Sequence, residues 1–160
     1  EVPGDYHEAQ YVEAGLNGEI WFGRDTDPDF MSASDHGAYR QLLRTDGRSL
    51  TEFDEADGIQ PWGGFGGFGS ALGVLAVAPD GAVWMSSPLG EEGTLGEECG
   101  GLGRFDGTGL STYLDGHCVV DIDFMPSGEA WLLAEGPHVR EKHAGRYSGD
   151  MGVFRVEPGS

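Results

Sequence analysis

Hydrophobic and polar positions along the chain alternate in short runs that are typical of β-strands. The segments Val74 to Met85 and Gly101 to Leu114 together contain four such runs, separated by turn residues. No long stretch places apolar residues at positions i, i+3, i+4 and i+7, and 29 Gly and 8 Pro interrupt the chain. The sequence therefore predicts an all-β protein with little or no helix.

The group of four runs, strands a to d, recurs as three copies. In each copy a glycine stands three residues before a tryptophan, as in Gly18 and Trp21, Gly81 and Trp84, and Gly128 and Trp131. Asn-Gly and Asp-Gly supply the positive φ of a tight hairpin turn, and the tryptophan ring is large enough to pack between neighbouring sheets. We expect one domain over 1–160, with copies at about 7–58, 72–115 and 117–160.

This pattern resembles the two-component-regulator propeller repeat, in which a Gly-Leu-x-Arg-Phe-Asp-Gly strand follows an aromatic-rich one, as Gly101 to Gly107 does here. It is also similar to the repeat of streptogramin lyases, in the phrases Glu19 to Gly23 and Arg40 to Gly47. The resemblance implies a β-propeller of four-stranded antiparallel blades, with about three blades in this chain. It implies no single function, because such repeats serve sensors, lyases, lactonases and scaffolds.

Three blades do not close a ring, since propellers have roughly four to eight. The third copy reaches Ser160 without a strand d. We expect that the ring is completed either by a second copy of the chain, in a dimer of two half-propellers, or by the remainder of a longer propeller. Glu1 to Tyr6 would add an edge strand to a blade whose other strands come from elsewhere.

The predicted connections differ sharply in length. The a-b and c-d turns are tight, whereas the b-c connections (Arg24 to Gly37, Pro88 to Gly101, Glu135 to Gly152) and the d-a connection (Asp54 to Ala71) are long. All the long connections fall on one face, and long loops on a rigid scaffold usually carry the binding site.

Candidate binding residues lie in these loops. Trp62, Phe65 and Phe68, spaced by Gly-Gly, form either an aromatic lip for a sugar, ring or peptide side chain, or a core over the blade junction. His138, Arg140 and His143 belong to a cationic segment that meets a carboxylate or a partner's acidic loop, or is solvated. His36 could converge with His138 and His143 at the rim of the channel, as the lyase resemblance requires.

Asp25, Asp27 and Asp29 alternate as Asp-x-Asp-x-Asp and offer oxygen ligands suited to calcium or another divalent metal. They lack the glycine and closing glutamate of an EF-hand loop, so a solvated acidic loop is the alternative.

The net charge of −19 argues against nucleic acid and anionic membranes as partners, and no apolar run reaches the length of a membrane span. Cys99 and Cys118 are the two cysteines of the chain, and they fit a single disulfide or, alternatively, two reduced thiols. A disulfide favours a secreted or periplasmic protein.

The sequence contains no Gly-x-Ser-x-Gly and no His-Glu-x-x-His. The first hypothesis is therefore a non-catalytic module that binds a small molecule, glycan or protein on the long-loop face. A lyase-like enzyme using His, Glu and a metal is the second hypothesis, and a structural assembly unit is the third.

Overall fold

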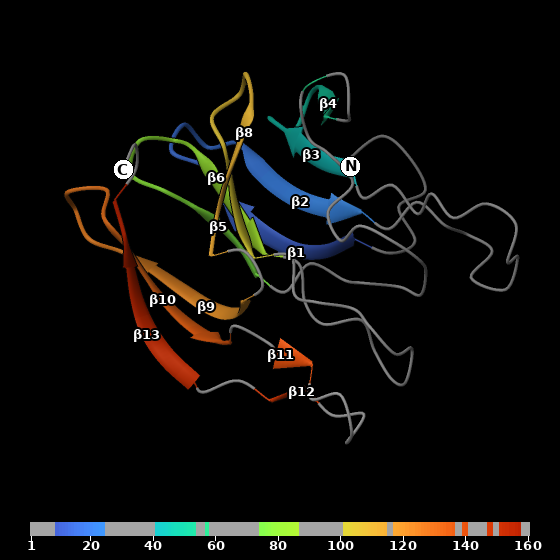
Figure 1. Ribbon diagram of the computed structural model, residues 1–160. Helices are drawn as coiled ribbons and strands as arrows, with labels where there is room; N and C mark the ends of the chain where they lie inside the picture. Colours follow the sequence, from blue (N-terminus) through green and yellow to red (C-terminus); the bar gives the residue numbers. More distant parts are fainter. Residues whose placement is uncertain are drawn as a thin grey trace, which may run out of the picture.

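The computed structural model shows an all-β protein, as predicted (Figure 1). Within the part of the chain that the structure describes there are three antiparallel sheets, a short hairpin and no α-helix. This arrangement is consistent with a partial propeller-like fold of about three blades. The described residues are 9–24, 41–53, 57, 74–86, 101–114, 117–136, 139–140, 147–148 and 151–157.

The first two sheets each contain four strands paired in the order of the sequence. The first sheet consists of β1 (Ala9–Ala14), β2 (Ile20–Arg24), β3 (Gln41–Thr45) and β4 (Leu50–Phe53). The second consists of β5 (Val74–Val77), β6 (Val83–Ser86), β7 (Leu102–Phe105) and β8 (Leu110–Tyr113). They match strands a to d of the first two predicted copies.

The third sheet has three strands, in the order β13-β10-β9. They are β9 (Cys118–Phe124), β10 (Ala130–Glu135) and β13 (Met151–Val156), which correspond to strands a, b and c. Two further short strands, β11 (Val139–Arg140) and β12 (Tyr147–Ser148), pair with each other in the third b-c connection. This hairpin was not predicted from the sequence.

The a-b turns have the conformation that the sequence predicts. Gly18, Gly81 and Gly128 have φ angles of 83°, 87° and 88°. Side chains with a Cβ rarely adopt this conformation, so glycine at this position fixes a tight turn and with it the pairing of strands a and b.

The sheets lie side by side, and the inner strand β5 contacts both β1 and β9. Two hydrophobic cores fill the spaces between them. The core between the first and second sheets consists of Trp21, Leu42, Phe53, Leu75, Val83, Met85 and Phe105. The core between the second and third sheets consists of Ala78, Ala82, Trp84, Leu102, Val119, Ala130, Leu132, Ala134 and Val156.

The pattern of buried side chains along each strand shows whether one or both faces of its sheet are covered. All four residues of β6 are buried, because the second sheet has a neighbouring sheet on each face. In the first sheet Trp21 is buried on one face, and Phe22 and Leu43 on the other. In β10, by contrast, buried and exposed residues alternate, so the third sheet has one covered and one exposed face.

Candidate functional site

The long connections leave the sheets at one common end. Strand pairing places Arg24 opposite Gln41, Ser86 opposite Leu102, and Glu135 opposite Met151. These pairs are the last residue of each strand b and the first of each strand c, so all three b-c connections start and finish at the same end. We call it the loop-bearing end. The predicted binding residues lie in the connections that join the strands at this end.

Described residues give this end a rigid base where the second and third sheets meet. Ser86 is fully buried, and its Oγ donates a hydrogen bond of 3.0 Å to the carbonyl oxygen of Val119. The His117 ring meets the Phe154 ring edge-on, with centroids 5.0 Å apart, and its backbone N–H donates to the Leu114 carbonyl. Neither Ser86 nor His117 stands out in the sequence, because their partners lie on other strands.

Gly101, just before β7, allows a close backbone approach at the same end. Its φ is +77°, and a Cβ there would stand 2.6 Å from the Tyr113 carbonyl oxygen and 2.7 Å from that of Leu114. A larger residue would therefore push the start of β7 away from the end of β8.

Most of the predicted site residues lie outside the described residues and stay predictions. Arg140 is the exception, because its backbone pairs with that of Tyr147 in the β11-β12 hairpin, so this member of the cationic segment lies in regular structure. Among the described residues there is no group of three His, Cys, Asp or Glu side chains that could hold a metal. The residues outside are Trp62, Phe65, Phe68, His36, His138 and His143 for binding, and Asp25, Asp27 and Asp29 for the metal.

The first residue of β9 is one of the two predicted disulfide cysteines. Cys118 is buried and is not a free thiol. Cys99 lies outside the described residues, so a bond between these two residues stays a prediction.

A cross-strand pair that the sequence analysis missed recurs in every sheet. The repeated tryptophan of strand b lies directly opposite an arginine of strand c, in the pairs Trp21 with Arg44, Trp84 with Arg104, and Trp131 with Arg155. In the first two copies the arginine stands two residues before an Asp-Gly. This repeated spacing is the sequence feature from which the pair could have been predicted.

In the first sheet this pair is capped by the aromatic residue of strand d. Trp21 stacks on Phe53 with ring centroids 5.5 Å apart and planes at 22°. The Arg44 guanidinium lies over both rings, 5.3 Å from the Trp21 centroid and 5.4 Å from that of Phe53. Stacking and cation–π attraction therefore hold strands b, c and d together.

The second sheet repeats the stacking. Trp84 stacks on Tyr113 of strand d at 5.3 Å and 20°, and Phe124 of the third sheet meets it edge-on at 5.8 Å. Arg104 donates from Nη2 to Asp80 Oδ2 over 2.7 Å. The ring stack thus recurs in both four-stranded sheets, whereas the partner of the arginine differs between them.

In the third sheet the tryptophan is exposed. Trp131 is 42% exposed, compared with 4% for Trp21 and 0% for Trp84. Its Nε1 donates to Glu129 over 2.7 Å, and Arg155 donates to Glu157 over 2.8 Å. The prediction that these tryptophans pack between sheets is confirmed for the first two and wrong for Trp131, because no described sheet lies on that face.

Acidic residues stabilise the tight turns at the opposite end. Backbone N–H groups of Ser49 and Arg48 and the Ser49 hydroxyl lower the pKa of Asp46. The hydroxyl and N–H of Thr108, with the Gly109 N–H, lower the pKa of Asp106 in the same way.

Asp80, in the a-b turn of the second sheet, is partly buried. Burial raises the pKa of Asp80, but hydrogen bonds from Arg104 and the Ala82 N–H, together with the Arg104 charge, outweigh burial and lower it overall. Part of the strong acidity of the chain therefore serves turn structure.

Comparison with known proteins gives little further information. No family model matches the sequence, and no curated protein does. A solved structure of a mannose phosphorylase from Leishmania mexicana, in complex with a phosphate ion, aligns with 98% of this chain at 16% identity and a TM-score of 0.44. The match spans 50% of that protein's chain, and the likeness is too low to indicate a shared activity.

No helix in the described part of the chain is long and apolar enough to cross a membrane.

Proposed function

We propose that this chain is a non-catalytic propeller module that binds a small molecule, glycan or protein at its loop-bearing end. The observation that carries the proposal is the convergence of all three b-c connections on one end of three packed sheets. A rigid β scaffold with long loops gathered at one end is a common arrangement for binding sites. The resemblance to two-component-regulator repeats, which include sensors, agrees with this assignment.

The proposed contact residues are the aromatic segment with Trp62, Phe65 and Phe68, and the histidine and arginine side chains of the first and third b-c connections. Arg140 lies in a short hairpin, which would present the neighbouring cationic residues from an ordered base. His36, His138 and His143 complete the proposed set, and Asp25, Asp27 and Asp29 are the proposed calcium ligands.

We further propose that the module completes its ring by self-association and works in a secreted or periplasmic setting. The exposed face of the third sheet, with Trp131 at its centre, supports the first point. Cys118, the one cysteine among the described residues, is not a free thiol, and this observation supports the second point.

The test is a ligand panel of sugars, small metabolites and peptides, measured as a rise in melting temperature. A triple variant at Trp62, Phe65 and Phe68 to Ala should abolish the rise. Arg48→Ala, in an exposed turn at the opposite end, is the matched control and should retain it. If no compound stabilises the wild-type chain, or if the triple variant responds equally, the loop-bearing end is not the binding site.

Two other outcomes would assign a different function. Metal-dependent turnover that disappears in His36, His138 or His143 variants would indicate a streptogramin-lyase-like enzyme. A defined oligomer that responds to no compound would indicate a structural assembly unit.

A further inference from the structure

The turn between β1 and β2 contains the pair Asn17-Gly18, and Asn17 is the one asparagine of the chain. Asparagine is thermolabile, and it loses its side-chain amide most readily when glycine follows it, because glycine has no side chain to hinder attack by its backbone nitrogen. The other two a-b turns have Asp80 and Ser127 at the equivalent position. The three turns therefore differ in the residue on which this reaction depends.

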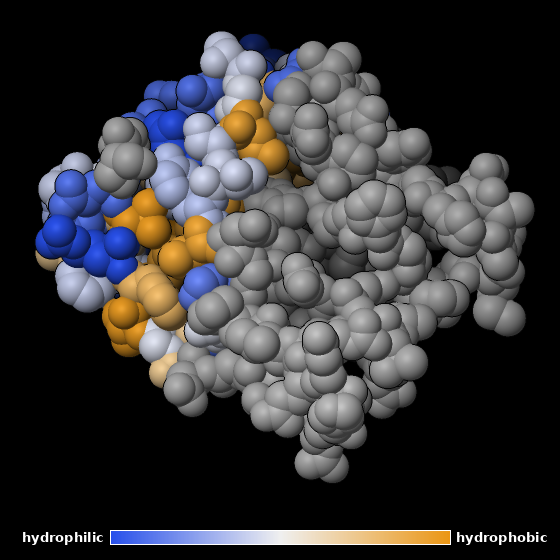
Figure 2. Space-filling model, viewed as in Figure 1, coloured by the Kyte–Doolittle hydropathy of each residue, from blue (hydrophilic) through white to orange (hydrophobic). Residues whose placement is uncertain are grey.

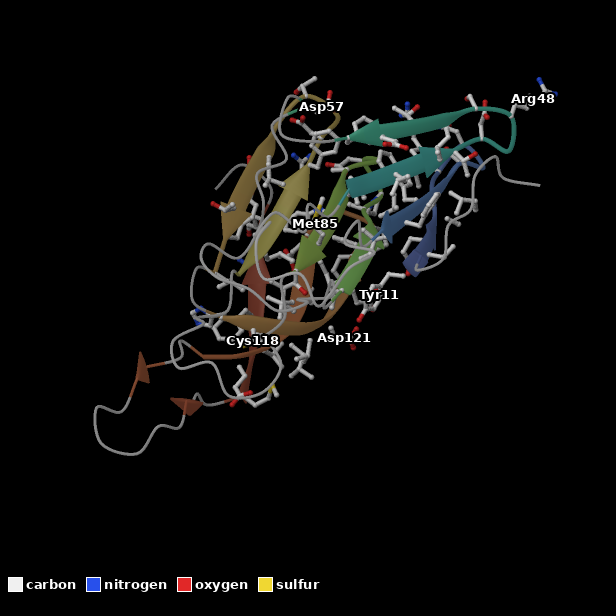
Figure 3. All side chains as sticks on the ribbon, turned by 90° about the vertical axis from the view of Figure 1, so that its right-hand side faces the viewer. Tyr11, Arg48, Asp57, Met85, Cys118 and Asp121 are labelled. Carbon is white, nitrogen blue, oxygen red and sulfur yellow. The ribbon has the colours of Figure 1, made fainter. Side chains whose placement is uncertain are left out.

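The Asn17-Gly18 pair is open to solvent. Both residues are exposed, and a Cβ added at Gly18 would meet no atom within 4 Å. Figure 2 shows hydrophilic surface in the region where Figure 1 places the β1-β2 turn. The β3-β4 turn lies at the same end of the sheet, because Ile20 pairs with Thr45. Figure 3 shows Arg48 pointing outward from the tip of that turn. Water and hydroxide therefore reach the pair.

The side-chain amide of Asn17 is available for reaction. The backbone N–H of Asn17 donates to Glu19 Oε2 over 2.9 Å, but within the described residues no hydrogen bond holds its side chain. In the second turn, by contrast, the Asp80 carboxylate accepts a hydrogen bond of 2.7 Å from Arg104. An ionised carboxylate is a poor target for a nucleophile, and the Ser127 side chain has no carbonyl carbon at all. Of the three a-b turns, the first is thus the reactive one.

The backbone nitrogen that attacks the amide is held more loosely in the first turn than its equivalents are in the other two. The Gly18 N–H donates to the Gly15 carbonyl oxygen over 3.4 Å, which is longer than the usual range of about 2.7–3.2 Å. The corresponding bonds of Gly81 and Gly128 are 2.9 Å and 2.8 Å long. The N–H must leave its acceptor before the nitrogen attacks, so the weaker bond lowers the barrier in the first turn.

We propose that Asn17 is a site of spontaneous deamidation. The Gly18 backbone nitrogen gives up its proton to base and forms a bond to Cγ of Asn17. The Cγ–Nδ2 bond breaks, and Nδ2 takes up a proton and leaves as ammonia, so that a succinimide ring remains. Water then adds OH to one carbonyl carbon of the ring and a proton to the nitrogen, and the bond between them breaks. Cleavage at Cγ gives aspartate, and cleavage at the main-chain carbonyl carbon gives isoaspartate.

The aspartate product gives the first turn the residue that the second turn already has. Asp80 pairs with Arg104, which lies opposite Trp84. Arg44 lies opposite Trp21 in the same register, so it is the expected partner of an aspartate in the first turn. Isoaspartate instead adds a carbon atom to the main chain and should weaken the pairing of β1 with β2. The inference is independent of the proposed function, because this turn lies at the end opposite the long loops.

The test is incubation of the purified chain at neutral and mildly alkaline pH, followed by intact mass and peptide mapping. The expected result is the mass gain of a single amide-to-acid conversion, located at Asn17 and faster at the higher pH, because the attacking nitrogen must lose its proton. Asn17→Ser, which copies the third turn, is the matched control and should show no gain at this turn. The inference is overturned if Asn17 stays intact under conditions where a synthetic peptide of residues 14–20 converts completely.

Ser127→Asn tests the role of the glycine hydrogen bond. It places a second Asn-Gly pair in the third turn, where the Gly128 N–H bond is 2.8 Å long, so one sample reports both rates. The pair in the third turn should convert about fivefold more slowly than Asn17, the factor that corresponds to one hydrogen bond of about 1 kcal/mol. Equal or faster conversion there would show that this bond does not control the reaction. The wild-type measurement stands whether or not this variant folds.

Discussion

The hydroxyl of Ser86, at the end of β6, donates a hydrogen bond of 3.0 Å to the carbonyl oxygen of Val119 in β9. This bond joins the second sheet to the third at the base of the loop-bearing end, and both residues are buried.

Ser86→Ala should lower the free energy of unfolding by about 1 kcal/mol, because it removes a buried donor and leaves its acceptor in an apolar core. Chemical denaturation measures the change. Ser111→Ala, at an exposed position of β8, is the matched control and should change stability by about 0.5 kcal/mol or less. Equal effects at both positions would mean that the bond contributes nothing.

The two environments of the repeated tryptophan predict different costs of removing it. Trp84→Ala should destabilise the chain by about 3–5 kcal/mol, because it empties the core between the second and third sheets. Trp131→Ala should cost about 0.5 kcal/mol or less in the monomer. A large loss at Trp131 in a sample shown to be monomeric would contradict the exposed position of this ring.

Gly101→Ala should lower the free energy of unfolding by more than about 1 kcal/mol. The φ of this residue is unfavourable for alanine, and the new Cβ would also clash with the backbone of Tyr113 and Leu114. Gly109, whose added Cβ would meet no atom within 4 Å, is the comparison site, and Gly109→Ala should be close to neutral. The melting temperatures of the two variants test this prediction. Similar values would argue against the close approach of Gly101 to the end of β8.

Acid should destabilise the turns. The folded-state pKa values of Asp46, Asp80 and Asp106 are lowered from 3.8, so their contribution to stability is present above that pH and is lost as the pH falls through the folded values. Asp106→Asn keeps an acceptor oxygen but cannot titrate, and it should make the acid limb of the stability profile shallower. Thr108→Ala, which removes the hydroxyl donor, should act in the same direction and less strongly. An unchanged acid limb in both variants would contradict this role of the turn.

The predicted disulfide should protect both cysteines from alkylation in denaturant without reductant, as measured by intact mass. Reduction should lower stability by about 3 kcal/mol, since the bond from Cys99 to Cys118 would close a loop of roughly 20 residues. Two alkyl groups on the unreduced chain would show that the pair is open.

The sequence predicted the features that depend on local chemistry. The glycine of each a-b turn and the tryptophan three residues later fixed three hairpins, because turn geometry is determined by the residues within it. It did not predict the β11-β12 hairpin, since two-residue strands carry almost no periodic signal.

Contacts between sheets were harder to predict. Trp131 and Trp84 hold the same position in their repeats, three residues after the turn glycine. Their exposure differs because it depends on whether another sheet lies beside them. The pairing of Trp21 with Arg44 required a strand register that the phrase from Arg40 to Gly47 left open. The predicted ligand contacts, such as Trp62 and His138, lie outside the described residues.

The full burial of β6 has a dynamic consequence. Opening the second sheet must expose two cores at once, whereas opening the third exposes one, and in stacked repeats stability depends on nearest neighbours. Amide protons of β6 should therefore exchange with solvent more slowly than those of β13. Of the three described sheets, the third is therefore the one best able to separate and re-form while the core between the other two stays intact.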